Sequence, residues 1–424
     1  MIGITTSRLR GNRDFQILCI TQGLSRLGTQ ISAIAFPLLV LRTTRSPADA
    51  GIVGFAEGAA MAVALLPGGT VADRFHRRTV MVACDACCAL TMALLSAAVL
   101  TRHVPMALIV PAAAVVSALG ATAYSAGAAA FRLVVSDAEL PQAVSVMQAR
   151  NAGIGLIGPA LGGLMFGIAY GLPFVVDAVS YGASLLGVLA LRTSLAAPAP
   201  ASGQQGTGLL KETVRGVVFV YRHKFIRFTL ANAAVLNFAL AGVLLSIIVT
   251  VVKGGASPLT TGAVIGFVGL GSLLGSLLAP AAKRRLSLHQ AVVLVTWVCA
   301  VTVAGMAFTR NVAALAVLVA ASALLVPALN VITRSAQTLI TPDGMQGRVA
   351  SATTFVALSI NPLGSVAAGF LLARWRPEIA FLTFAAVIVV LAVASSATDA
   401  LRSVRPQQPV PQGQAVDVEA AQST

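Results

Sequence analysis

Five ionisable side chains lie inside long apolar stretches of the sequence: Arg26, Glu57, Asp85, Arg150 and Asp177. In a membrane each would cost about 2.5–3.5 kcal/mol at the centre of a helix, so each is a candidate for binding a proton or a ligand. Glu57 is the first candidate for proton binding, because burial disfavours the charged form of an acid. Two alternatives stay open for it: a fixed ion pair with Arg26 or Arg150, and a hydrated position near one membrane face.

Asp177 is the second candidate for proton binding. It lies about two helical turns from the end of its apolar run, so a hydrogen bond between helices is favoured over proton binding. Asp85 is expected to be a structural partner of the nearby basic segment. Polar residues in the apolar runs are candidates for lining a cavity: Arg26, Gln30, Tyr124, Gln148, Arg150, Asn151, Asn237 and Asn330. For Asn237 and Asn330, in the second half, a role in joining helices is equally open.

The elements that position these residues are long apolar runs. The chain of 424 residues is 57% hydrophobic and only 10% charged, with a mean hydropathy of +0.88, whereas soluble domains have about 25% charged residues. A spanning helix needs about 20 apolar residues, and an outer-membrane barrel is excluded because its strands alternate over about ten. The sequence predicts an all-α membrane protein with twelve spans, at 15–41, 50–72, 79–101, 105–131, 143–168, 172–191, 225–252, 259–280, 290–309, 312–335, 348–373 and 377–398.

The distribution of Lys and Arg predicts the orientation in the bilayer. If the N-terminus is cytoplasmic, 20 of the 29 basic residues face the cytoplasm and seven face the other side, while Arg26 and Arg150 lie within spans. Both termini are therefore expected in the cytoplasm. The net charge of +15 does not indicate nucleic-acid binding, because the basic residues come in small groups between spans.

The chain is expected to fold as two six-helix bundles. Residues 1–191 form the first, 192–224 a cytoplasmic linker, 225–398 the second bundle and 399–424 a disordered cytoplasmic tail. "SDAELPQAVSV…GPALGG" in the fifth span is similar to "TPDGMQGRVAS…NPLGSVAAG" in the eleventh. Parallel repeats of this kind are typical of secondary transporters.

Metal, cofactor and enzyme chemistry are not expected. The sequence "CDACC" (84–88) lies in an apolar run without a second ligand pair, which favours packing over a metal site. No Gly-x-x-x-x-Gly-Lys-Ser/Thr motif indicates ATP binding. A polytopic membrane enzyme stays as an alternative, although no aspartate-rich, His-box or nucleophile-elbow motif supports it.

A charged segment, "GGTVADRFHRRTV" (68–80), separates the second and third spans. Its glycine would let a neighbouring helix approach, and its aspartate could meet the N-terminus of the eleventh span, so that the two halves close on the cytoplasmic side. The arginines could hold that aspartate or lipid headgroups, or simply form a basic loop. The predicted gating residues are Gly69, Asp73, Arg74, Arg77 and Arg78.

A second motif, "GPALGG", lies in the fifth span and has "NPLG" as its counterpart in the eleventh. Proline in mid-helix removes a hydrogen bond and bends the helix, and the glycines leave a smooth face for a neighbour. Gly and Pro are also simply frequent in membrane helices. The predicted bend residues are Gly158, Pro159, Gly162, Gly163 and Pro362.

Together these motifs resemble the major facilitator superfamily, whose signature between the second and third helices is Gly-x-x-x-Asp-Arg-x-Gly-Arg-Arg; His76 replaces its internal glycine here. "GPALGG" is similar to the motif of the superfamily's exporters, although Ile154 replaces an earlier glycine. Over residues 15 to about 400 the chain is similar to the bacterial group that contains the enterobactin exporter and macrolide efflux proteins. The resemblance implies that spans one, two, four and five line a cavity.

From these features the chain is expected to export a drug, siderophore or natural product by proton antiport and alternating access. Its expected place is the bacterial inner membrane, as a monomer, with a small molecule, protons and the lipid bilayer as partners and with no cofactor. Few Trp and Tyr residues are present (two Trp and four Tyr), which favours a large apolar or amphiphilic substrate. The fourth span lacks the arginine found in many drug–proton antiporters, so Arg26 or Arg150 would have to replace it. An importer with the same fold is the alternative.

Overall fold

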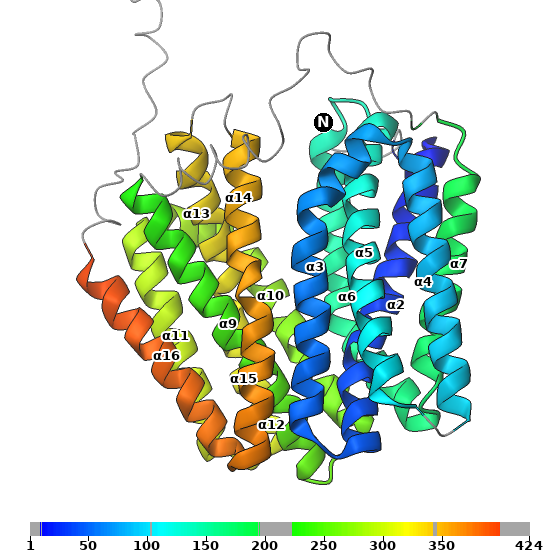
Figure 1. Ribbon diagram of the computed structural model, residues 1–424. Coiled ribbons are helices and arrows are strands. Elements are labelled where there is room, and N and C mark those ends of the chain that lie inside the picture. The colour runs from blue at the N-terminus through cyan, green and yellow to red at the C-terminus, as the bar shows by residue number, and fades with distance from the viewer. Residues whose placement is uncertain are drawn as a thin grey trace, which may run out of the picture.

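The computed structural model describes residues 9, 11–101, 104–193, 195, 223–341 and 346–398, apart from the side chains of 66–74, 346–348 and 350–352. All regular elements in this part of the chain are helices (Figure 1). They are α2 (Arg13–Thr44), α3 (Pro47–Arg74), α4 (Arg77–Leu100), α5 (Met106–Val134), α6 (Leu140–Ile168), α7 (Leu172–Leu189), α9 (Lys224–Lys253), α10 (Pro258–Arg285), α11 (Leu288–Phe308), α12 (Val312–Leu324), α13 (Val326–Ile340), α14 (Gln346–Ser359), α15 (Asn361–Arg374) and α16 (Pro377–Ala397).

Twelve candidate membrane spans lie within the described residues, by length and composition. This confirms the predicted fold class. Two spans that the sequence predicts as single helices are each divided into two: α12 and α13 meet at Leu325, and α14 and α15 meet at Ile360. A proline follows each junction, in the first turn of the next helix. At that position its missing N–H removes no helical hydrogen bond, and its ring prevents the preceding helix from continuing without a break.

Short polar residues begin several helices. The side chain of Asn12 accepts a hydrogen bond from the backbone of Phe15 at the start of α2, and Ser257 does the same for α10. Ser287 and Gln290 form a reciprocal capping box at α11. These caps satisfy N–H groups that the first helical turn leaves free.

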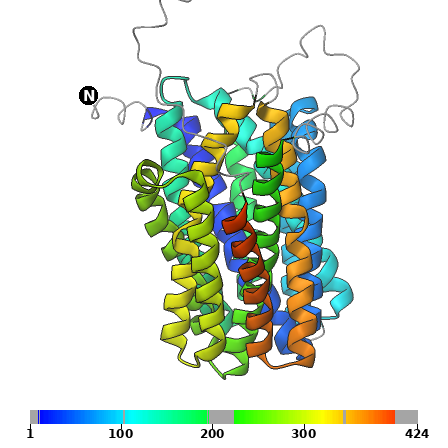
Figure 2. The same cartoon turned by 90° about the vertical axis from the view of Figure 1, so that its left-hand side faces the viewer.

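The helices form two groups, α2–α7 and α9–α16, which stand side by side (Figures 1 and 2). They meet where α6 packs against α10 and where α3 packs against α15. We call the end at which α2 begins, at the top of Figure 1, the upper end, and the end at which α2 gives way to α3 the lower end.

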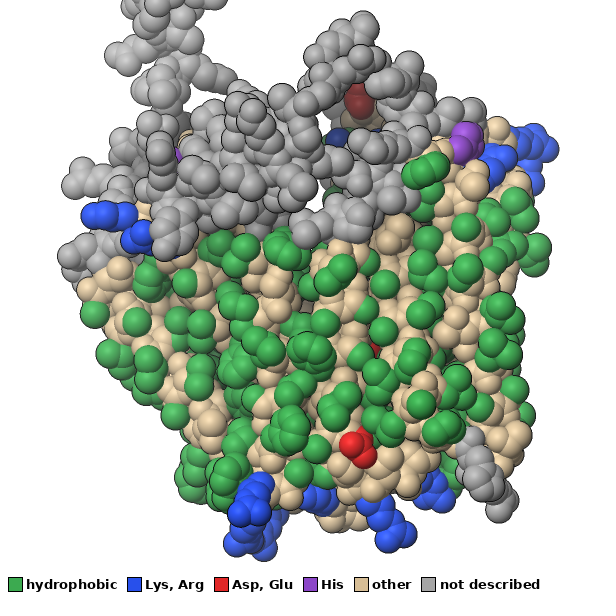
Figure 3. Space-filling view, viewed as in Figure 1, with side chains coloured by type: hydrophobic (Ala, Val, Ile, Leu, Met, Phe, Trp, Pro, Cys, Tyr) green, Lys and Arg blue, Asp and Glu red, His purple; other side chains and the backbone are tan. Residues whose placement is uncertain are grey.

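On the face seen in Figure 3, apolar side chains lie over most of the surface between the two ends, and Lys and Arg lie at its margins. Leu100, Leu277 and Phe308 are among the large apolar side chains that point outward. Such a continuous apolar band on a helical protein is typical of a surface that contacts lipid tails. The chain is therefore a multi-pass membrane protein.

Candidate functional site

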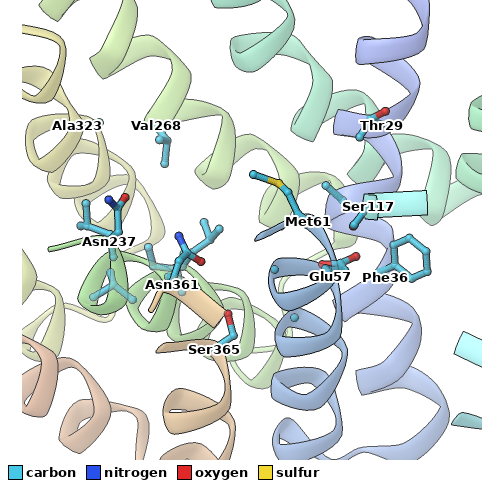
Figure 4. Close-up of a pocket in the computed structure, with 18 of the residues that line it drawn as sticks. Thr29, Phe36, Glu57, Met61, Ser117, Asn237, Val268, Ala323, Asn361 and Ser365 are labelled. Atoms are coloured by element: carbon cyan, nitrogen blue, oxygen red, sulfur yellow. The ribbon is translucent and has the colours of Figure 1, made fainter. Parts of the chain in front are cut away.

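A cavity of about 510 Å³ lies between the two groups of helices. α2, α3 and α5 form its wall on the side of the first group, and α9, α10, α12, α13 and α15 form the other wall. Most of the lining is aliphatic or aromatic, and Phe36, Met61 and Val268 are examples (Figure 4). The size and composition are those of a site for a small organic molecule.

The polar groups of the cavity are few and lie on both walls. The first group of helices contributes Thr29, Ser32, Glu57 and Ser117. The second group contributes two amides and three hydroxyls: Asn237, Ser272, Ser322, Asn361 and Ser365. A bound molecule could therefore contact one acid, several hydroxyls and two amides within an otherwise apolar surface.

Glu57 is the acidic residue that lines this cavity. Its side chain lies near Ser117 and Phe36, and Asn237, Asn361 and Ser365 lie across the cavity (Figure 4). Among the described residues, none forms an ion pair or a hydrogen bond with the Glu57 carboxyl group. A partly buried carboxyl without a fixed partner can exchange a proton or bind a cationic group.

The two arginines considered as ion-pair partners of Glu57 have other partners. The guanidinium of Arg26 lies over the ring of Tyr124, 5.6 Å from its centroid. Arg150 donates to the carbonyl of Cys19 at 2.6 Å and to the Asn151 side chain at 2.9 Å. The ion pairs considered for Glu57 are therefore not formed in this conformation.

Only some predicted cavity residues line this cavity. Glu57 and Asn237 do, and Asn237 also donates to the carbonyl of Ala233 at 2.8 Å. Gln30 instead packs against Gly158 at the contact between α2 and α6. The others lie outside the cavity lining: Arg26, Tyr124, Gln148, Arg150, Asn151 and Asn330.

Asp177 lies directly behind the cavity wall. Its side chain is fully buried and accepts a hydrogen bond of 2.5 Å from Ser32, which itself lines the cavity. Asp85 is also buried, and it interacts with Ser184 of α7. The alternative of a helix–helix hydrogen bond at Asp177 is thus realised, and it involves a cavity residue.

The predicted gating segment is only partly described. The side chains of Gly69, Asp73 and Arg74 lie outside the described residues. Arg77 is buried, and Arg78 donates to the carbonyl of Leu191 at 2.6 Å and to that of Thr193 at 3.1 Å. Arg78 thereby joins the start of α4 to the segment that follows α7.

The glycines of "GPALGG" form close contacts with two neighbouring helices. A side-chain carbon at Gly163 would collide with the carbonyl of Pro258, and one at Gly162 would lie 2.5 Å from the carbonyl oxygen of Ile31. Gly262 of α10 faces Pro159 in the same way. Pro159 lies inside the continuous helix α6. The motif therefore brings the backbones of α6 and α10 together across the two groups.

Sequence reasoning missed the equivalent contact between α3 and α15. A side-chain carbon added at Gly51 of α3 would lie 2.7 Å from the carbonyl oxygen of Ser365 in α15. One added at Gly58 would lie 2.8 Å from the ring of Pro362. The spacing in "GIVGFAEG" (51–58) places these glycines on one helix face. That spacing was the available signal.

Among the residues whose side chains the structure describes, the closest backbone contacts at glycines between the two groups lie in the lower half of the molecule. Pro258 opens α10 and Pro47 opens α3 at the lower end, and the carbonyl of Pro47 faces Gly369 near the end of α15. The highest of these glycine contacts joins Gly269 to Gly155, near the middle of α6. In this conformation the two groups are thus joined at the lower end.

The comparisons with known proteins agree with this architecture. The family model described as Major Facilitator Superfamily matches residues 18–362. The multidrug efflux pump Tap of Mycolicibacterium fortuitum is 28% identical over 351 residues, covering 81% of this chain and 85% of that protein. The pump of the same name from Mycobacterium tuberculosis (strain ATCC 25618 / H37Rv) is 29% identical over 409 residues, covering 88% and 91%.

Two solved structures share the fold at low sequence identity. A bacterial homologue of the human lysosomal transporter Spinster, in an inward-facing and unoccupied conformation, has a TM-score of 0.74 at 14% identity and covers 94% of this chain and 98% of its own. The nucleoside transporter NupG has a TM-score of 0.69 at 14% identity and covers 93% and 100%.

Proposed function

The chain belongs to the major facilitator superfamily, and from this we propose that it exports a largely apolar or amphiphilic organic molecule by proton antiport. Its place is the bacterial inner membrane, where it works as a monomer. The observation that carries the proposal is the apolar cavity of about 510 Å³ between the two helix groups, with the Glu57 carboxyl on its wall.

The direction and the substrate class come from two independent features. The relatives from Mycolicibacterium fortuitum and Mycobacterium tuberculosis are named multidrug efflux pumps. The cavity offers an aliphatic surface with Phe36 as an aromatic group and one acid, which suits apolar or cationic amphiphilic molecules better than a sugar.

The proposed transport cycle alternates access to the cavity. In this proposal the upper end, where α2 begins, faces the cytoplasm, which the excess of Lys and Arg predicted for that side supports. With the lower end joined by the contacts of α6 with α10 and of α3 with α15, the described conformation would receive substrate from the cytoplasm. Rocking of the two groups would then open the lower end to the outside.

In this proposal Glu57 couples the export of substrate to the entry of protons. The carboxylate would hold a cationic or polar group of the substrate, and a proton arriving from outside would neutralise the acid and release the substrate. The same carboxyl group cannot hold both ligands at full strength, so binding of one favours release of the other. This competition is the minimal requirement for antiport.

The experiment is uptake into inverted membrane vesicles against a panel of neutral and cationic lipophilic compounds, with and without a proton gradient. We expect gradient-dependent accumulation of at least one compound by the unchanged protein. Glu57→Gln should lower that accumulation by a factor of about 10 or more, which corresponds to about 1.4 kcal/mol. Glu139→Gln is the matched control, because Glu139 bonds to Ser136 near the start of α6, outside the cavity.

Three results would contradict the proposal. Accumulation that needs ATP and no gradient would exclude proton antiport. Transport of every substrate out of inverted vesicles, towards the cytoplasmic side, would identify an importer. Full activity of Glu57→Gln would remove Glu57 from the coupling step.

A further inference from the structure

A row of polar residues lies on one face of α7 and is buried inside the first group of helices. Asp177, Ser180, Tyr181 and Ser184 follow one another at helical spacing, so they share a face. Asp177 has no exposed surface, and Tyr181 and Ser184 are each 2% exposed. These groups face other helices rather than lipid, and no role in the proposed substrate cavity accounts for them.

The row touches the cavity through α2. Ser32 donates to Asp177 Oδ2 at 2.5 Å, and Thr29 shares a hydrogen bond of 3.1 Å with the Tyr181 hydroxyl. Both Thr29 and Ser32 line the cavity. Gly28 leaves the space for this contact, since a side-chain carbon there would lie 2.5 Å from Asp177 Oδ1. Asp177 is therefore one hydroxyl group away from the cavity.

A second carboxyl group, that of Asp85 on α4, lies next to Ser184, the last residue of this row. Asp85 is 3% exposed and interacts with Ser184, while its Oδ2 atom is buried without a hydrogen-bond partner. The thiol of Cys88, also on α4, lies within electrostatic range of both Asp85 and Asp177. The two acids thus share one buried compartment between α2, α4 and α7.

Within the part of the chain that the structure describes, neither acid forms an ion pair with Lys, Arg or His. The titratable groups facing the pair are Cys84 and Cys88 on α4 and Tyr181 on α7, and α2 contributes hydroxyl groups. Two buried carboxylates without a cation are expensive, because desolvation disfavours the charged form of each. The compartment therefore favours at least one bound proton.

We propose that Asp177 and Asp85 form a proton-binding pair, outside the substrate cavity, that exchanges protons with the cavity through Ser32. In the exchange, a hydronium ion in the cavity gives a proton to Ser32 Oγ and becomes water, while the hydroxyl proton of Ser32 passes to Oδ2 of the Asp177 carboxylate, which becomes a neutral carboxylic acid. Ser180, which donates to Asp177, and Ser184, which interacts with Asp85, lie one helical turn apart on α7 between the two acids. This inference deepens the proposed proton antiport and rests on it for its role in transport.

The test is infrared spectroscopy of the purified full chain in lipid, in a Glu57→Gln background so that Glu57 does not contribute. We expect a carboxylic-acid C=O band at neutral pH that shifts in heavy water. Asp177→Asn and Asp85→Asn should each remove intensity from it, and Ser32→Ala should shift its frequency because a hydrogen bond to Asp177 is lost. Asp137→Asn, an exposed acid, and Ser117→Ala, another cavity hydroxyl, are the controls and should leave the band unchanged.

Two results would overturn the pair: a band that keeps its intensity in both Asp variants, or no carboxylic-acid band in the parent. If the Asp variants fail to fold, the test depends on Ser32→Ala. A band that does not shift in this variant would show that Ser32 donates no hydrogen bond to a protonated acid and would overturn the proposal. The readout needs no transport. A band lost in Asp177→Asn together with gradient-independent transport by the unchanged protein would therefore support the proton site and reject the antiport.

Discussion

The contact between α3 and α15 offers the sharpest test of how the two groups of helices close. Gly51→Ala adds one side-chain carbon at a point 2.7 Å from the Ser365 carbonyl oxygen and 3.0 Å from Gly369 Cα. Ordinary van der Waals contact begins at 3.4 Å. Both opposing atoms belong to the backbone of α15, so no side chain can rotate away and the helices must separate.

The cost of this separation can be estimated. Overpacking a tight contact by one carbon costs about 1–3 kcal/mol, and a free energy of this size changes a conformational equilibrium by about 5–150-fold. The clash exists only when the lower end is closed. The substitution should therefore shift the population towards the conformation in which the lower end is open.

The assay is cysteine labelling in intact cells with a membrane-impermeant maleimide, in a variant without the five native cysteines. Asn237→Cys places the reporter in the cavity, which the reagent can reach from outside only when the lower end opens. Gly51→Ala should raise the labelling rate within the 5–150-fold range. Gly153→Ala is the matched control, because a carbon added at Gly153 meets nothing within 4 Å. Equal rates in the two variants would refute this account of the closed end.

Two further predictions concern stability. Asp14 accepts hydrogen bonds from the backbone of Arg192 and from the backbone and hydroxyl of Thr193; Asp14→Asn should lower the free energy of unfolding by about 1.5–3 kcal/mol, measured by denaturation in detergent, because charge-assisted bonds are lost. Ser287→Ala removes the capping box with Gln290 and should cost about 0.5–2 kcal/mol, seen as faster hydrogen exchange in the first turn of α11.

The controls for these two substitutions are exposed residues of the same type. Asp137→Asn removes a charge without a buried partner, and Ser276→Ala removes an exposed hydroxyl that bonds within its own helix. A midpoint for Asp14→Asn equal to that of Asp137→Asn would show that the bonds to Arg192 and Thr193 contribute nothing. Unchanged exchange at α11 in Ser287→Ala would reject the capping box as a stabilising element.

The number of spans and the fold class could be predicted from composition and run length, since apolar segments of about 20 residues can only be stable in lipid as helices. The breaks at Leu325 and Ile360 are local as well, because each precedes a proline. Pro362 is a predicted bend residue, whereas the break before Pro327 was not predicted, because the apolar run at 312–335 continues through that proline.

The candidate site could be predicted only in part. An ionisable residue in an apolar run is visible as a rare event, and this identified Glu57, Asp85 and Asp177. Which helix each one faces depends on helix rotation and on the choice of neighbour. For that reason an ion pair of Glu57 with Arg26 or Arg150 stayed an open alternative, and in the structure both arginines contact other groups.

The sequence by itself determined that this chain crosses the membrane twelve times, where its polar interruptions lie, and which family it resembles, because these follow from local hydrophobicity, charge and motif spacing. Tertiary structure decided which polar groups meet: that Ser32 joins Asp177 to the cavity, that Glu57 faces it without a partner among the described residues, and that the glycines of α3 meet α15. Helical periodicity specifies the face on which a residue lies. The partner of that face is set by packing among segments far apart in the chain.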